Sequence, residues 1–275
     1  MSSAQRVGHA YSIEHGHRRT QMMVFCTDLD NTLIYSYKHD IGEDKRCVEI
    51  YQGRAISFIT QETYRLLCEV KKQAIIVPVT TRTVEQYDRI DFGVGTFSYA
   101  LTCNGGVLLI DGHEDESWYQ ESLKMISDSR QELLRAVGLL EQEKRRTFEV
   151  RFIRELFVFT KCEEPEAVVR ELKSILDVSL VDVFNNGIKV YVVPKKLSKG
   201  KAVDRFRDYI GADCVIAAGD SEFDSSMLEA ADCGIAAPEL SGRYHFPEHV
   251  KCPPADKLFA EKVLETVLMY CRNGQ

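Results

Sequence analysis

The sequence predicts an α/β protein in which helices flank a parallel sheet and a separate α+β module is inserted into the chain. Short apolar strands alternate with helical segments in the first hundred residues, and the same alternation returns after Pro194. The segment between them contains paired strands joined by a hairpin signal, which is not typical of a parallel sheet. With 275 residues and 44% hydrophobic content, the chain is long enough for a large core and a smaller module.

The first part of the core begins with an apolar strand at residues 22–27. A charged Gly-Glu-Asp-Lys turn and an alternating stretch then predict a hairpin or flap within residues 35–58, with Gly53 at a turn or bulge. The spacing of apolar residues predicts a helix over 60–72. The remaining elements of this part are a strand at 74–79, a short helix at 83–90 and a strand at 99–102. Because strands and helices alternate here, we expect these strands to pair in parallel.

A hairpin from residue 107 leads into the inserted module, which continues with a long amphipathic helix over 121–143 and a strand over 147–160. A helix over 164–176 follows, with Pro165 in its first turn, where proline is favoured. Two strands at 179–184 and 188–193 flank Asn-Asn-Gly, a hairpin signal. The core then resumes with helices at 200–209, 225–231 and 255–271 and strands at 214–218 and 234–236.

These elements predict three parts of the chain. Residues 1–20 have no periodicity and are expected to form a mobile tail. Residues 21–107 and 194–275 form the core, and residues 108–193 form the inserted module. The formal charge of −7 argues against a broad nucleic-acid-binding surface, and no apolar run is long enough to span a membrane. Nine scattered cysteines and the lack of an apolar leader favour a cytoplasmic protein, which we expect to be a monomer or a homodimer.

The end of the first strand carries two aspartates. Residues 24–33 read V-F-C-T-D-L-D-N-T-L, so Asp28 and Asp30 are one residue apart and face the same way. The carboxyl end of a parallel strand is where α/β proteins bind ligands. A divalent cation there would relieve the repulsion between the two carboxylates, and Asp28 could then attack a phosphorus atom.

Three more features fall at strand ends or helix starts. Thr80 ends the second core strand, L-S-K-G-K-A (197–202) precedes a helix, and A-A-G-D-S-E-F-D (217–224) runs from a strand into an acidic loop. In this order, the set resembles the four motifs of the haloacid dehalogenase-like superfamily of phosphatases and phosphotransferases. The insertion, with L-T-C-N-G-G before it, is similar to the Cof-like branch with a large α/β cap, as in sucrose-phosphate phosphatases. The similarity of layout covers residues 20–272, whereas close identity is confined to the motifs.

The resemblance implies a Rossmann-like core and a set of roles. Asp28 matches the nucleophile that forms an aspartyl-phosphate, and Asp30 matches the general acid and base. Thr80 and Lys199 match the residues that bind the phosphoryl group. Mg²⁺ is the implied cofactor, because it prefers oxygen ligands and retains bound water. Its expected ligands are Asp28, the backbone carbonyl of Asp30, Asp220 and Asp224.

Three positions depart from the family pattern or compete for a role. Thr81 stands where this branch often has glycine, so Thr81 could replace Thr80 at the phosphate. Phe223 stands in place of a common asparagine and removes a polar contact next to Asp224. Lys201 lies two residues beyond Lys199, but Ser-Lys-Gly at 198–200 favours Lys199.

The resemblance implies a phosphatase that acts on a small phosphorylated metabolite, most simply a sugar phosphate. A phosphomutase or other phosphotransferase with the same site, and a non-catalytic ligand sensor with this fold, are the alternatives. Arg82 and Asn104 lie on loops near the expected site and are candidate substrate contacts. A basic cluster in the insert would fit a second anionic group on the substrate, although a solvated surface explains it too; its members are Lys144, Arg145, Arg146, Arg151 and Arg154.

Overall fold

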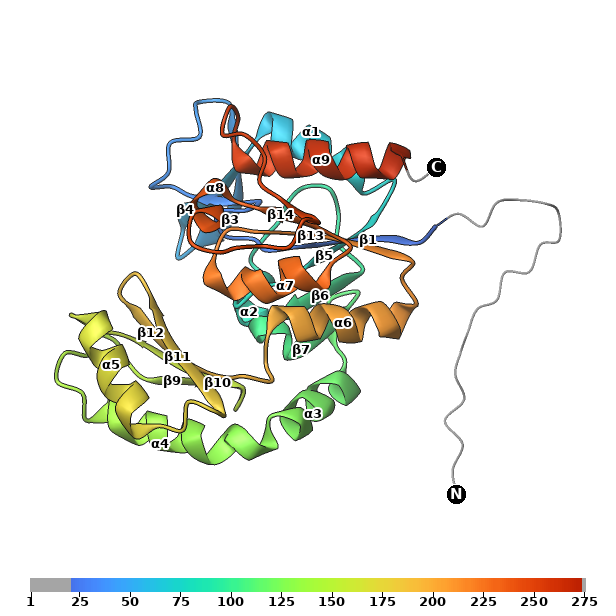
Figure 1. Cartoon of the computed structure of the whole chain (residues 1–275). Coiled ribbons are helices and arrows are strands. Elements are labelled where there is room, and N and C mark those ends of the chain that lie inside the picture. Colours follow the sequence, from blue (N-terminus) through green and yellow to red (C-terminus); the bar gives the residue numbers. More distant parts are fainter. Residues whose placement is uncertain (1–20, 274–275) are drawn as a thin grey trace, which may run out of the picture.

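The computed structural model describes residues 21–273, and the tail predicted at residues 1–20 lies outside them. Its centre is a five-stranded parallel sheet (Figure 1). In order across the sheet, the strands are β15 (Val250–Lys251), β14 (Cys233–Ala236), β13 (Cys214–Gly219), β1 (Met23–Thr27) and β5 (Ile75–Pro78). No helix within the described residues is both long enough and apolar enough to cross a bilayer.

Helices cover both faces of this sheet because successive strand residues point to opposite sides. On one face, Phe25 and Ile76 pack with α1 (Gln61–Val70) and α9 (Phe259–Asn273), which lie side by side in Figure 1. On the other face, Val24 and Val77 pack with α6 (Lys199–Ile210) and α7 (Ser225–Ala230). The short helices are α2 (Val84–Tyr87) and α8 (Pro238–Ser241). The parallel α/β core predicted from the strand–helix alternation is confirmed.

Two small antiparallel sheets extend the core. The flap consists of β2 (Tyr35–Ser36), β3 (Lys45–Tyr51) and β4 (Arg54–Thr60). The second sheet consists of β6 (Tyr99–Thr102), β7 (Val107–Ile110) and β8 (His113–Glu114). The prediction of a parallel partner for residues 99–102 holds only locally: a parallel bridge joins Leu101 to Val79, and Thr80 N–H donates to the Leu101 carbonyl over 2.8 Å. Along its length β6 pairs with β7 in an antiparallel ladder instead.

The inserted cap region has its own sheet, in the order β11 (Val181–Asn186), β12 (Lys189–Pro194), β10 (Phe157–Lys161) and β9 (Arg151–Ile153). The apolar residues of one face, among them Val158 and Val192, pack against α4 (Arg130–Glu141) and α5 (Pro165–Ile175). The helix α3 (Glu116–Met125) leads into this region (Figure 1). The boundary predicted at residues 107 and 108 falls inside β7, which pairs with β6.

Three further predicted elements differ from the structure. The helix predicted over 121–143 is broken by a 3-10 turn at Ser127–Ser129, a Ser-Asp-Ser run of residue types that favour caps and turns over helix interiors. The strand predicted over 147–160 is the β9–β10 hairpin, whose turn places Arg154 and Glu155 in left-handed conformations. Neither residue is a typical turn former, so the sequence carried no local signal for this hairpin. The last helix begins at Phe259 rather than at residue 255.

Candidate active site

The carboxyl ends of the central strands bring the motifs together. Asp28 directly follows β1, and its backbone N–H donates to the carbonyl of Ala218 in β13 over 2.9 Å. Asp220 follows β13, and Lys199 is the first residue of α6, which is capped by Ser198. Because β1 and β13 are parallel neighbours, residues almost two hundred positions apart in the chain meet at one edge of the sheet.

Lys199 forms the centre of the charged cluster. Its ammonium group donates to Asp28 Oδ1 over 2.5 Å and to Asp224 Oδ1 over 2.6 Å. All three side chains are buried. Burial raises the pKa of Asp28 well above its usual range, and neighbouring carboxylates add to this effect while Lys199 opposes it. Burial lowers the pKa of Lys199, but the charges of Asp224 and Asp28 outweigh it, so Lys199 stays protonated.

The loop after β13 orders the remaining carboxylates. Asp224 Oδ2 accepts hydrogen bonds from the backbone N–H groups of Asp220 and Ser221 and from the Ser221 hydroxyl. Burial and the charge of Asp224 raise the pKa of Asp220 to about 6. This tight loop depends on Gly219, because a Cβ there would lie 2.2 Å from Cβ of Asp224.

The three carboxylates fit a divalent cation. Asp28, Asp220 and Asp224 each place an oxygen within 4.8 Å of the others. One lysine balances three acidic groups here, so an added positive charge and oxygen coordination suit the donor set, and Mg²⁺ takes such ligands. The structure brings together the three carboxylates predicted to bind the metal. The fourth predicted ligand is the backbone carbonyl of Asp30, whose carboxylate contacts Arg82.

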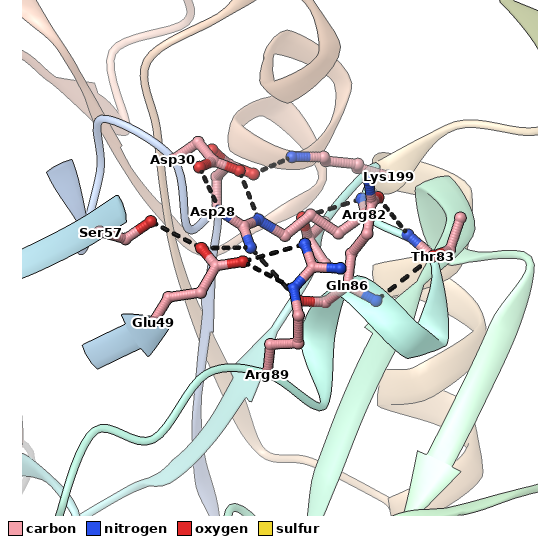
Figure 2. A network of polar contacts seen from close by, with 10 residues as sticks. Asp28, Asp30, Glu49, Ser57, Arg82, Thr83, Gln86, Arg89 and Lys199 are labelled. Carbon is pink, nitrogen blue, oxygen red and sulfur yellow. Dashed lines mark hydrogen bonds and ion pairs between the residues drawn. The ribbon is translucent and has the colours of Figure 1, made fainter. Parts of the chain in front are cut away.

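Asp30 is held by an arginine. Arg82 donates from Nε and Nη2 to the two carboxylate oxygens of Asp30, over 2.8 and 2.7 Å (Figure 2). The surrounding protein alone would raise the pKa of Asp30, but the hydrogen bonds and charge of Arg82 lower it below its usual value. Asp30 is therefore ionised in this arrangement. Arg82, predicted as a substrate contact, lines the cavity, but its guanidinium group binds Asp30, the candidate general acid.

The flap supplies a residue that sequence reasoning missed. Glu49 of β3 is fully buried and accepts hydrogen bonds from Arg82 over 3.0 Å, Arg89 over 3.1 Å and Ser57 over 2.6 Å (Figure 2). It thus anchors the far side of Arg82 and links the flap to the site. The available signal was an acidic residue flanked by the apolar residues Val48 and Ile50.

The loop after β5 separates the two threonines. Thr80 is buried, and its hydroxyl accepts the backbone N–H of Arg82 over 3.1 Å. Among the described residues, Thr81 lines the cavity that contains Asp28 and Thr80 does not. Asn104 is also buried: its amide donates to the carbonyl of Leu197 over 3.0 Å and its backbone N–H to the carbonyl of Thr80 over 2.9 Å. This placement favours a positioning role for Asn104 over the predicted substrate contact.

A cavity of about 760 Å³ lies between the core and the cap sheet. Its core wall contains Asp28, Asp30, Lys199 and Asp220, and its cap wall is rich in aromatic side chains. Phe223 joins the two walls, because its ring packs edge-on against the rings of Phe184 and Tyr191, with centroid distances of 4.7 and 5.1 Å. The residue that departs from the family pattern therefore makes an apolar contact between core and cap.

Known proteins share this architecture. A sequence model of the haloacid dehalogenase-like hydrolase family matches residues 139–239, which include Lys199, Asp220 and Asp224. The structure of the sucrose-phosphatase from Synechocystis, in complex with sucrose and phosphate, superimposes with a TM-score of 0.65 over 91% of this chain and 98% of that chain, at 18% identity. Residues 139–239 thus match the haloacid dehalogenase-like hydrolase family, and the chain has the fold of the sucrose-phosphatase over nearly its whole length.

Two further proteins are similar to this chain. The phosphoglycolate phosphatase of Methanopyrus kandleri is 29% identical over 178 residues, which are 62% of this chain and 73% of that protein. A phosphatase of the HAD superfamily from Bacteroides thetaiotaomicron has a TM-score of 0.52, with 17% identity, and covers 94% of this chain and 98% of its own. The fold that the sequence motifs implied is thus confirmed over nearly the whole chain.

Proposed function

We propose that this protein is a Mg²⁺-dependent phosphatase that cleaves a small phosphorylated metabolite, such as a sugar phosphate, through an aspartyl-phosphate on Asp28. The observation that carries the proposal is the buried contact of Lys199 with Asp28 and Asp224 at the floor of the cavity. A volume of about 760 Å³ suits a small molecule, and the cap sheet limits access for a folded protein surface.

In the first step, an oxygen of Asp28 forms a bond to phosphorus while the bond to the leaving oxygen breaks. Lys199 and the hydroxyl of Thr81 would stabilise the negative charge on the transferred group. Asp30, in its protonated form, gives its proton to the leaving oxygen. In the free site, Arg82 lowers the pKa of Asp30. A bound phosphate dianion beside Asp30 disfavours a second negative charge there, so substrate binding raises the pKa of Asp30 again.

In the second step, Asp30 accepts a proton from water as that water attacks phosphorus, and the bond to Asp28 breaks. Arg82 holds Asp30 in the ionised form that this step needs. Asp28, Asp220 and the backbone carbonyl of Asp30 would hold Mg²⁺, with Asp224 as a further ligand or as the residue that orients Asp220. When bound, Mg²⁺ supplies charge stabilisation to the phosphoryl oxygens.

The test is phosphate release from a panel of sugar and nucleotide monophosphates, with Mg²⁺ or with EDTA. We expect metal-dependent turnover in the wild type and its loss in Asp28→Asn. Asp204→Asn is the matched control, because Asp204 is exposed on α6 and should leave turnover unchanged. A folded wild-type protein that releases no phosphate from any ester would reject hydrolysis and favour a phosphomutase or a ligand sensor.

A further inference from the structure

The cap face that closes the cavity follows a regular pattern. In β9, β10 and β12, alternate residues point into the cavity: Arg151 and Ile153, then Phe157, Phe159 and Lys161, then Lys189 and Tyr191. The residues between them, such as Val158 and Val190, point to the helices of the cap. The face toward the catalytic residues therefore carries both aromatic rings and positive charges.

Two lysines on this face are direct neighbours. Lys161 of β10 and Lys189 of β12 are opposite each other in the antiparallel ladder, and Asn186 of β11 is opposite Lys189 on its other side. All three line the cavity. Like charges placed directly opposite each other destabilise a sheet, so this pairing works against the stability of the free protein.

No carboxylate within residues 21–273 lies at ion-pair distance from either lysine. By contrast, members of the basic cluster predicted in the cap are occupied: Arg145 pairs with Glu143 and Glu171, and Arg154 pairs with Glu114. Of that cluster only Arg151 lines the cavity, and it pairs with Glu149. Lys161 and Lys189 are thus the described cations of the cavity wall that have no ion-pair partner, and the ammonium group of Lys161 lies 4.8 Å from the centroid of the Phe148 ring.

The position of Lys161 and Lys189 indicates which part of the substrate they would bind. Lys189 is close enough to Asp30 and Arg82 for their charges to act on its pKa, which partial burial lowers. Asp30 is the residue proposed to protonate the leaving oxygen, so a group bound by Lys189 belongs to the leaving alcohol. The next row of the same face carries Phe159 and Tyr191, whose rings stack at 5.7 Å and form an apolar wall.

We propose that Lys161 and Lys189, with Asn186, form a subsite for a second acidic group on the substrate, so that the preferred esters are those whose leaving alcohol carries a carboxylate or another phosphate. This inference rests on the proposed phosphatase function and names its substrate class. Binding of the acidic group would offset the repulsion between the two lysines and would place the ester oxygen next to Asp30.

The experiment compares matched esters. Glycerol 3-phosphate and 3-phosphoglycerate differ by a carboxylate, and glucose 6-phosphate and glucose 1,6-bisphosphate differ by a phosphate. The wild type should favour the acidic member of at least one pair, and the pair that shows the preference identifies the acidic group. Lys161→Gln and Lys189→Gln should each lower the ratio of kcat/KM, acidic over neutral, by about tenfold or more, as for a lost charge-assisted hydrogen bond.

Lys173→Gln is the charge-matched control, because Lys173 is exposed on α5, and it should leave the ratio unchanged. Lys161→Arg keeps the charge and should retain most of the preference. Thermal unfolding measures the repulsion between Lys161 and Lys189: without ligand, Lys161→Gln should raise Tm by about 1 °C. A simple structural role for Lys161 would instead lower Tm and reduce turnover of both esters alike.

Equal kcat/KM for both members of each pair, or no greater effect in the two lysine variants than in Lys173→Gln, would overturn the inference. Turnover of p-nitrophenyl phosphate that Asp28→Asn abolishes would leave the phosphatase proposal intact in that case. If no ester is hydrolysed, calorimetric binding of 3-phosphoglycerate and glucose 1,6-bisphosphate still decides the point. Binding that is unaffected by Lys161→Gln and Lys189→Gln would then reject the subsite.

Discussion

Lys199 is 1% exposed, and its ammonium group contacts two buried carboxylates, so one side chain serves both the fold and the proposed chemistry. The arrangement is tolerated because each charge has a partner. Removing one partner of a buried ion pair leaves an uncompensated charge, which costs more than the pair contributes.

We therefore expect Lys199→Met to lower the free energy of unfolding by about 3–5 kcal/mol and to reduce kcat by about a hundredfold or more. Urea denaturation and phosphate release measure the two effects. Lys201→Met is the matched control, because Lys201 lies two residues along the same helix and is exposed. Equal losses in both variants would contradict the special role of Lys199.

At the scale of elements, the packing of α6 on α7 places Lys199. Gly200 allows this contact, since a Cβ at this position would lie 2.3 Å from the backbone oxygen of Ser226. Gly200 N–H also donates to the Ser226 hydroxyl over 3.1 Å. The glycine of the Ser-Lys-Gly motif is thus required by the close approach of two helices, independently of any ligand.

Gly200→Ala should destabilise the protein by about 1–3 kcal/mol, because the neighbouring atom is backbone and cannot rotate away. Gly138→Ala makes the same chemical change in α4, where no atom lies within 4 Å of the added Cβ. It should stabilise the helix by about 0.5–1 kcal/mol. Denaturant unfolding of both variants checks the opposite signs, and a loss of stability in Gly138→Ala would show that backbone contacts do not explain the difference.

The flap, the core and the cap region meet around the cavity, so the whole molecule responds to what the site binds. Burial raises the pKa of Asp220 from its usual 3.8 to about 6. Between these values the folded state holds a proton that the unfolded state has lost. In the metal-free protein this contribution to stability is present at low pH and is lost as the pH rises through about 6.

A divalent cation reverses this dependence, because it requires ionised carboxylates and binds the folded state. We expect excess Mg²⁺ to raise Tm by several degrees at pH 7.5 and by much less at pH 5. EDTA should abolish the shift. Thermal unfolding at the two pH values measures it, and Asp220→Asn should remove most of the Mg²⁺ effect. An equal shift at both values would argue against a cation held by these carboxylates.

Much of the core follows from local pattern. The strands before Asp28 and Asp220 are short apolar runs, and the helix of Lys199 has a serine cap, so the positions of these residues at strand ends and at a helix start were predictable. Parallel pairing then forces those ends to one edge of the sheet. The gathering of Asp28, Lys199, Asp220 and Asp224 was thereby implied by the sequence, although no single motif demonstrates it.

Other features depend on which distant segments meet, and the tertiary structure alone decided them. The hairpin turn at Arg154 and Glu155 has no local signal, and the pairing of β10 with β12 is what places Lys161 opposite Lys189. Glu49 becomes the anchor of Arg82 only because the flap folds over the loop after β5. The periodicity of apolar residues indicates which face of a segment is buried. The partners of a charged side chain depend instead on which elements pack together, and a local sequence pattern does not contain that information.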